Sequence, residues 1–218
     1  MKKKMSFIMC VIVLIISMFS VNFAYAHEMY YNGSTPIVLR WDHVSGSTLN
    51  VLMSDDLLDA PFTSHYSIAR NAWPNALASA STKVTVTDSS FSNSNLDLAT
   101  ASEDYWQERW GPVQYIVVLG VCNITSTDGI LIDSASDAAS SSKKIRYAGI
   151  LFNPYESAFA DETAIRYTMV HEIGHAFGLG HPNDVYYPTE AASVMRTYGV
   201  PNYYTPQAHD VTDMNNKY

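Results

Sequence analysis

Hydrophobic and polar residues alternate along several short stretches of this 218-residue chain, as they do in half-buried strands. Residues 48–53 and 83–87 show this alternation, and residues 144–152 form a further apolar stretch that we predict to be a strand. Residues 114–121 are the most apolar segment beyond the N-terminal region, so we expect a central strand there, covered on both faces. The pattern therefore predicts a sheet built from these segments.

A helix is predicted between residues 62 and 80, where apolar residues recur at helical spacing. Pro74 falls inside this pattern and is expected to kink or split the helix. Residues 88–103 are rich in Ser and Asn and are predicted to form a long surface loop. Residues 134–144 are rich in Ser and Ala without a hydrophobic pattern, so a mobile loop is expected there as well.

A further helix is predicted from about residue 161 onward. Asp161 or its neighbour can cap the start of this helix, and Glu162 suits its positive N-terminal end. One stripe of the helix is apolar and is formed by Ile165, Met169, Ile173 and Ala176. One side of the helix is therefore expected to pack on the sheet, and the opposite side is left for polar groups.

The opposite side carries the run HEIGHAFGLGH at residues 171–181, which has the form H-E-x-x-H-x-x-G-x-x-H. His171 and His175 are four residues apart, so both imidazoles lie on one helix face. Gly178 can take a positive φ and end the helix, which lets His181 return as a third ligand. Three protein ligands leave a fourth position of a zinc ion open, as in catalytic zinc sites. Histidines without a metal are the alternative, and Gly178 and His181 together disfavour it.

Glu172 projects about 100° around the helix from His171, so it is placed beside the metal and not on it. A zinc ion lowers the pKa of a bound water towards ~7 and polarises a substrate carbonyl. Glu172 is then the candidate general base and proton donor to the leaving amine. A zinc site without catalytic activity is the second alternative.

The motif resembles that of the metzincin metallopeptidases, and most closely the matrixin-type group with its secreted bacterial members. Ser193, Val194 and Met195 resemble the family's tight turn, which carries a methionine beneath the zinc. Residues 204–218 resemble the closing helix of matrixin catalytic domains. Asp210 matches the acid that holds this helix against the methionine turn, whereas His209 stands where another acid is usual.

The resemblance implies an α+β fold, with a twisted mixed sheet and about three helices. It implies a zinc metalloendopeptidase in which His171, His175 and His181 hold one Zn²⁺ and Glu172 is catalytic. It also makes residues 147–151 (Tyr147 to Leu151) the candidate sheet edge for docking an extended substrate, with a plain edge strand as an equal alternative.

The pocket on the leaving-group side is expected, again by resemblance, to be walled by residues 197–204. Four side chains are candidates for shaping it: Arg196, Tyr198, Tyr203 and Tyr204. The sequence does not choose among them.

The N-terminal residues 1–26 are typical of a secretory signal peptide, with Lys2, Lys3 and Lys4 before an apolar stretch and an A-x-A site ending at Ala26. An uncleaved membrane anchor is the alternative, which the shortness and polar interruptions of the stretch disfavour. Cleavage leaves residues 27–218, which we interpret as a single catalytic domain. We therefore expect a secreted, extracellular protein without stable membrane association, acting as a monomer.

The formal net charge of −8 argues against nucleic acid as a partner, and removal of the N-terminal lysines makes the charge more negative. Protein or peptide substrates are the partners that the motif implies. Cys122 is expected to be a buried, inert thiol. A calcium site formed by Asp128, Asp133 and Asp137 is conceivable, but their spacing matches no defined calcium loop and favours a solvated turn.

Two other functions stay open at this stage. A non-catalytic extracellular binding module can use a zinc-containing fold without turnover. A zinc amidase acting on a non-peptide amide would use the same ligands and base.

Overall fold

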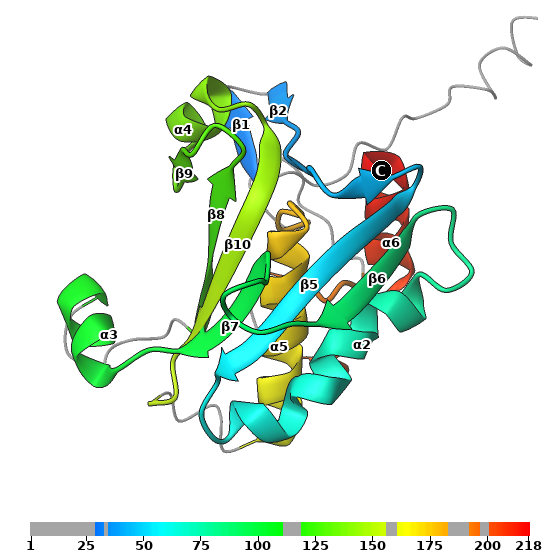
Figure 1. The fold of residues 1–218 in the computed structure, drawn as a ribbon. Coiled ribbons are helices and arrows are strands. Elements are labelled where there is room, and N and C mark those ends of the chain that lie inside the picture. The colour runs from blue at the N-terminus through cyan, green and yellow to red at the C-terminus, as the bar shows by residue number, and fades with distance from the viewer. Residues whose placement is uncertain (1–28, 33–34, 111–118, 156–160, 183–191, 197–200) are drawn as a thin grey trace, which may run out of the picture.

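The computed structural model describes residues 29–32, 35–110, 119–155, 161–182, 192–196 and 201–218 (Figure 1). The architecture is α+β, with a twisted mixed sheet and helices α2 (Tyr66–Ala76) and α5 (Glu162–Ala176) side by side on one of its faces. The signal-peptide prediction for residues 1–26 lies outside the described residues. Among those that are described, no helix is both long and apolar enough to cross a bilayer.

The main sheet has the order β4-β5-β7-β10-β8-β9, with β6 beside β5 and β3 beside β10. Its long strands β5 (Thr48–Leu57), β6 (Lys83–Asp88), β7 (Leu96–Thr100) and β10 (Lys144–Phe152) run parallel to one another, and β8 (Gly120–Ser126) is antiparallel to β10. The short strands are β3 (Arg40–Trp41), β4 (Val44–Ser45) and β9 (Leu131–Ile132). A separate hairpin pairs β1 (Tyr30–Asn32) with β2 (Thr35–Ile37).

The strands predicted at residues 48–53, 83–87 and 144–152 are confirmed as β5, β6 and β10. The loop predicted at residues 88–103 is wrong in part, because β7 lies within it. Leu96 and Leu98 of β7 are fully buried, and the strand pairs with β5 on one side and β10 on the other. A short strand of this kind is stabilised by its neighbours on both sides, which the local Ser and Asn content does not reveal.

The mobile loop predicted at residues 134–144 is also wrong, because residues 135–140 form helix α4 (Ala135–Ser140). The Ser134 side chain caps α4 by accepting a hydrogen bond from the Asp137 backbone N–H. Ala138 is fully buried against the rest of the core. One cap and one buried methyl group thus order a segment that has no amphipathic pattern.

The prediction of a central strand at residues 114–121 is not met by the described part of that segment. Residues 114–118 lie outside the described residues, and β8 begins at Gly120. Within the described residues, β8 pairs with β10 along its length and with β9 only at Ile124 and Thr125. It is therefore next to the sheet margin, and the central position belongs to β10.

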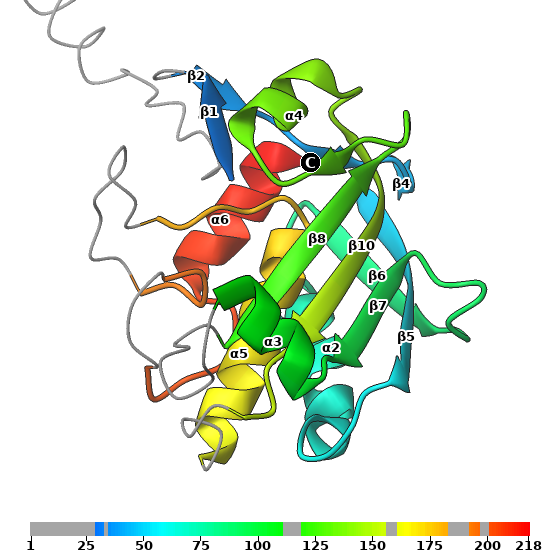
Figure 2. The ribbon, with the colours of Figure 1, turned by 90° about the vertical axis from the view of Figure 1, so that its left-hand side faces the viewer.

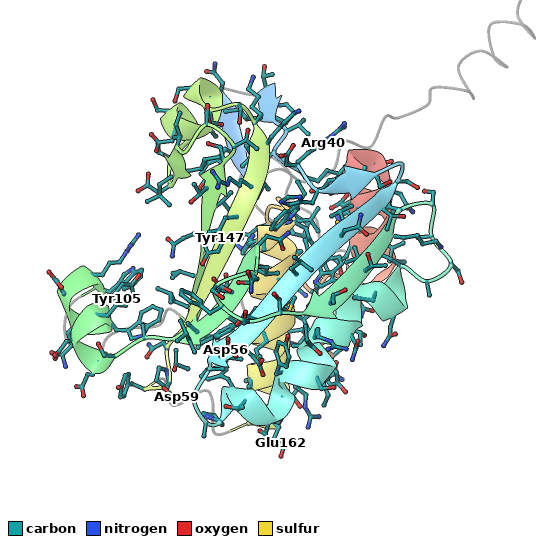
Figure 3. All side chains as sticks on the ribbon, in the orientation of Figure 1. Arg40, Asp56, Asp59, Tyr105, Tyr147 and Glu162 are labelled. Atoms are coloured by element: carbon teal, nitrogen blue, oxygen red, sulfur yellow. The ribbon has the colours of Figure 1, made fainter. Side chains whose placement is uncertain are left out.

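The proposed docking edge at Tyr147–Leu151 is wrong for the same reason. Tyr147 lies on β10 (Figure 3). This part of β10 pairs with β7 on one side and with β8 on the other, so its backbone groups are already hydrogen-bonded. The Tyr147 hydroxyl donates to the Asp97 carboxylate on β7, which places it on an interior strand. The apolar pattern identified a strand here correctly but did not give its position in the sheet.

The helix predicted at residues 62–80 is a 3-10 turn, η1 (Phe62–His65), followed by α2. Pro74 lies within the last turn of α2, which ends at Ala76, before the predicted end at residue 80. Helices α3 (Glu103–Trp110) and α6 (Ala208–Lys217) complete the fold (Figure 2). The described residues hold five α-helices, α2 to α6, where about three were expected.

Helix α5 is the element on which the site depends, and it is held firmly from several sides. The predicted stripe of Ile165, Met169, Ile173 and Ala176 is confirmed as buried core. The Trp73 indole of α2 donates to the Val170 carbonyl at 3.0 Å, and the Trp41 indole of β3 donates to the Ala176 carbonyl at 2.7 Å. These contacts fix the helix both along its axis and in rotation.

The start of α5 offers a direct test of its capping. Asp161 is the N-cap residue and its carboxylate accepts from the Thr163 N–H at 2.8 Å. Asp161→Ala is expected to lower the free energy of unfolding by about 1 kcal/mol, measured by chemical denaturation. Asp161→Asn keeps a capping oxygen and is the matched control, expected to lose much less. Equal losses in the two variants would contradict the capping role.

Candidate metal centre

Three imidazole side chains converge at the C-terminal end of α5. The Nε2 atom of His175 lies 3.0 Å from that of His171 and 3.0 Å from that of His181, and the last two are 3.2 Å apart. A zinc ion bound tetrahedrally by three imidazoles at ~2.0–2.1 Å separates their nitrogens by about 3.3 Å. Among the described residues, this is the group of His, Cys, Asp and Glu side chains whose ligand atoms lie close enough to share one ion.

The hydrogen bonds behind two of these rings fix which nitrogen is free. His171 Nδ1 lies 2.8 Å from the Val194 carbonyl oxygen, and His175 Nδ1 lies 2.7 Å from the Leu179 carbonyl oxygen. A carbonyl oxygen only accepts, so each Nδ1 carries the proton and donates. Each Nε2 therefore presents its lone pair to the centre of the cluster, which is the tautomer that a metal ligand needs.

Burial keeps the His171 and His175 rings neutral. It lowers the pKa of His171 to about 3, with the nearby His181 charge contributing less. Burial, followed by repulsion from His171 and His181, lowers the pKa of His175 well below its usual value. Neutral lone pairs that face one another at these distances repel, and a cation between them removes the repulsion. The donor set therefore fits a borderline-soft cation such as Zn²⁺.

A glycine ends α5 and returns the chain to the cluster. Gly178 has φ +79°, its N–H donates to the His175 carbonyl at 2.7 Å, and the Leu179 N–H donates to the Gly174 carbonyl at 3.1 Å. This is the paired hydrogen-bonding pattern of a Schellman C-cap. A Cβ at Gly178 would also lie 2.7 Å from the Leu39 carbonyl oxygen. Both conformation and space therefore require glycine here, as the sequence predicted.

The segment from Ser193 to Met195 forms a turn beneath the helix. Met195 is buried, and a Cβ at Gly174 would lie 2.2 Å from its sulfur, so the turn packs directly on α5. The Asp210 carboxylate of α6 accepts from the Ser193 hydroxyl, from the Val194 N–H at 2.9 Å and from the Gln207 N–H at 2.6 Å. The predicted contact between Asp210 and the methionine turn is confirmed.

This contact connects α6 to the metal centre. Asp210 holds the Val194 amide, and the carbonyl of the same residue orients the His171 ring. Burial raises the pKa of Asp210, while its hydrogen bonds to Ser193, Gln207 and Val194 oppose that shift and stabilise the carboxylate. His209, the departure from the family pattern, lies on α6 with its Nε2 3.5 Å from the Asp213 carboxylate.

Glu172 lies on the side of α5 that faces the sheet margin. A Cβ at Gly120, the first residue of β8, would lie 2.9 Å from Glu172 Cγ, so only glycine admits this packing. Burial raises the pKa of Glu172 to about 8. A divalent cation beside it would favour the charged carboxylate, because opposite charge lowers the pKa of an acid.

Two neighbours of the centre were not singled out from the sequence. Gly120 shapes the space for Glu172, and nothing in the local sequence signals that long-range contact. Tyr167 lies one helical turn before His171, and their ring centroids are 5.7 Å apart. Tyr167, His171 and His175 follow one another at intervals of four residues. A helical projection of the sequence therefore places Tyr167 on the face that carries the two histidines.

The sequence analysis also named a thiol, a possible calcium site and a tyrosine of the leaving-group pocket. Cys122 is partly buried, and burial raises the pKa of its thiol well above the usual value, with the Glu172 charge adding to the shift. Asp128, Asp133 and Asp137 form no converging ligand group in the described structure. Tyr198 lies outside the described residues.

No protein-family model matches the sequence, and no curated protein matches it. Among solved structures, that of myroilysin is similar with a TM-score of 0.40 and 11% sequence identity, covering 80% of this chain and 93% of that chain. A similarity this weak carries no assignment of function, which therefore rests on the residues of the centre.

The packing of Met195 on α5 predicts the effect of adding a methyl group at Gly174. Gly→Ala in the middle of a helix normally stabilises a protein by roughly 0.5–1 kcal/mol. Gly174→Ala is expected to do the opposite and destabilise by about 1–3 kcal/mol, because its Cβ would overlap Met195 and lie 2.8 Å from Trp73 Cζ2. Urea denaturation measures the change in the free energy of unfolding.

Gly149→Ala on β10 is the matched control. Its nearest contact would be the Tyr147 hydroxyl at 3.4 Å, so the control is expected to be neutral or stabilising. A stabilised Gly174→Ala variant would show that the turn does not press on the helix as described.

Proposed function

We propose that this chain is a secreted, zinc-dependent metalloendopeptidase of the metzincin type, similar to matrixins. The observation that carries the proposal is the convergence of three imidazoles whose Nε2 atoms lie within 3.2 Å of one another, with Glu172 on the helix that carries two of them. His171, His175 and His181 are the proposed ligands of one catalytic Zn²⁺. When bound, the ion supplies Lewis acidity towards a carbonyl and a water of pKa near ~7.

The chain's own residues have distinct roles in this proposal. The Val194 and Leu179 carbonyls hold the His171 and His175 rings in the ligand tautomer. Glu172 accepts a proton from the attacking water and passes it to the leaving amine. The Gly120 contact and the surrounding burial keep this carboxylate at one place, which a general base requires.

The margin of the sheet supports a polypeptide as the substrate. Residues 120–123 of β8 pair with β10 on one side, and no other described strand pairs with them on the second side. Glu172 packs against the first residue of this segment, so the unpaired edge adjoins the proposed base. An extended peptide can add to such an edge through backbone hydrogen bonds.

Secretion belongs to the proposal on the strength of the sequence of residues 1–26 alone. A single catalytic domain at residues 27–218 and a monomeric state remain predictions in the same way. A non-catalytic zinc-binding module is the competing function, and turnover of substrate separates the two.

Removal of the base is the decisive test of catalysis. Glu172→Gln keeps the size of the side chain and is expected to reduce cleavage of an unfolded protein substrate by ~10²–10⁴-fold, because general-base assistance is lost. Zinc content is measured on the same sample, so that loss of activity is not loss of metal.

Glu162→Gln is the matched control on the same helix. Glu162 lies at the far N-terminal end of α5, where its exposed carboxylate pairs with Arg166 (Figure 3). This variant is expected to retain cleavage. Undiminished activity of zinc-loaded Glu172→Gln would end the proposal.

Chelation tests the metal independently. The purified protein is expected to contain one zinc per chain, to lose cleavage and thermal stability with a chelator, and to regain both when zinc is restored. His175→Ala is expected to abolish stoichiometric binding, whereas His43→Ala, at an exposed position, is expected to leave it intact. Elemental analysis and thermal unfolding give the readouts, and a metal-free protein that still cleaves would contradict the assignment.

A further inference from the structure

The end of α6 packs on the turn that closes α5. Lys217 is the last residue of α6 and is only 1% exposed to solvent. A Cβ added at Gly178 would lie 2.9 Å from Lys217 Cε and 3.2 Å from Lys217 Nζ. The lysine side chain therefore fills the space that any side chain at position 178 would need.

Tyr218, the next residue, holds the same end of α5 through its hydroxyl group. The hydroxyl donates to the carbonyl of Phe177, the C-cap residue of α5, at 2.9 Å. It also accepts from the Trp41 N–H at 3.2 Å, which connects it to β3. Two consecutive residues of α6, Lys217 and Tyr218, thus contact two consecutive residues at the end of α5, Phe177 and Gly178.

The charge of Lys217 calls for an explanation beyond the filling of space. Lysine is almost never fully buried in proteins unless its ammonium group is paired, because a buried charge is costly. An apolar side chain of similar length would fill the same space without that cost. The end of a helix carries partial negative charge on its last carbonyl groups, which favours a cation beside it. The position of Lys217 therefore points to stabilisation of the end of α5.

The turn that Lys217 and Tyr218 contact serves the metal centre in two ways. Leu179, the residue after Gly178, provides the carbonyl that accepts from His175 Nδ1 at 2.7 Å. His181 follows two residues later and brings its Nε2 to 3.0 Å from that of His175. A displaced turn would misorient one proposed ligand and misplace another.

We propose that Lys217 and Tyr218 are positioning residues of the metal centre, which hold the Gly178 turn in the conformation that lets three imidazoles share one ion. They act through the turn and not by contact with the ion or the substrate. Groups that orient metal ligands in this indirect way typically contribute ~10–100-fold in metal affinity. This inference rests on the proposed function, because it requires that the three histidines bind zinc.

With these contacts, α6 supports all three proposed ligands from its two ends. At its start, Asp210 binds the Val194 amide, and the Val194 carbonyl orients His171. At its other end, the contacts with the Gly178 turn act on His175 and His181. One helix that carries no proposed ligand therefore sets the geometry of the whole cluster.

The test measures zinc affinity in the full-length, metal-free protein by competition with a chromogenic chelator. Lys217→Met keeps the length of the side chain and removes its charge, and it is expected to weaken zinc binding by ~10–100-fold. Tyr218→Phe removes one hydroxyl group and is expected to weaken binding by about three- to tenfold, as the loss of one hydrogen bond does. Circular dichroism verifies that each metal-free variant is folded.

Two control variants separate positioning from general effects. Lys83 Nζ donates to the Ala78 carbonyl at 2.7 Å beyond the end of α2, a helix without proposed ligands, so Lys83→Met removes a comparable lysine elsewhere. Asp161→Ala destabilises the opposite end of α5. Both variants are expected to keep the zinc affinity of the unmodified protein.

The geometry of the centre gives a second readout that loss of stability does not change. Cobalt(II) is bound in place of zinc, and its visible absorption bands report the arrangement of the ligands. The bands are expected to shift or change intensity in Lys217→Met and to stay unchanged in Lys83→Met and Asp161→Ala.

The outcomes distinguish this inference from the proposed function. Unchanged zinc affinity in folded Lys217→Met and Tyr218→Phe overturns the positioning role, as does an equal loss in Asp161→Ala. If Lys217→Met does not fold, Tyr218→Phe decides alone. An unmodified protein that binds zinc but cleaves no peptide overturns the peptidase and leaves the positioning role standing, whereas an unmodified protein that binds no zinc overturns both.

Discussion

The hydrogen bond from the His171 ring to the Val194 carbonyl is the interaction on which the rest of the site depends. It joins the histidine-bearing side of α5 to a turn that lies 23 residues further along the chain. The turn is itself fixed, since Asp210 binds the Val194 amide and Met195 packs on Gly174. Orientation of a single imidazole therefore requires that α5, the turn and α6 are all in place.

The same logic explains why α5 is held so tightly on its other faces. A proposed ligand set drawn from one helix and the turn after it tolerates little rotation of that helix, because a small rotation moves both His171 and His175. The indole hydrogen bonds of Trp41 and Trp73 act on the backbone carbonyls of α5 and resist such rotation. The Gly178 cap then sets where His181 returns. Precision at the centre is thus a property of the packed helix and not of the histidines alone.

The sequence predicted the local features of this arrangement well. The histidine spacing, the Asp161 cap and the Gly178 turn each depend on a few adjacent residues, and the contact of Asp210 followed from the family resemblance. The sheet was predicted less well, because strand position depends on partners far apart in the chain. The interior place of β10 is set by β7 and β8, and β7 itself is too short and too rich in flanking Ser and Asn to be recognised alone.

The candidate side chains for the leaving-group pocket illustrate the same limit. Only the three-dimensional contacts show that the Tyr203 hydroxyl hydrogen-bonds to the Ser193 backbone and that the Tyr204 ring lies against the Arg166 guanidinium.

Electrostatics would connect folding to binding of the proposed metal ion in this protein. The fold gathers three imidazoles whose Nε2 atoms converge, and burial prevents His171 and His175 from relieving the repulsion between lone pairs by protonation. A bound cation converts that repulsion into attraction between α5 and the segment carrying His181, which the unfolded chain cannot reproduce. Zinc is therefore expected to stabilise the native state through the helix end in particular. Because Val194 and Asp210 orient one of the ligands, this stabilisation should extend through the methionine turn to α6.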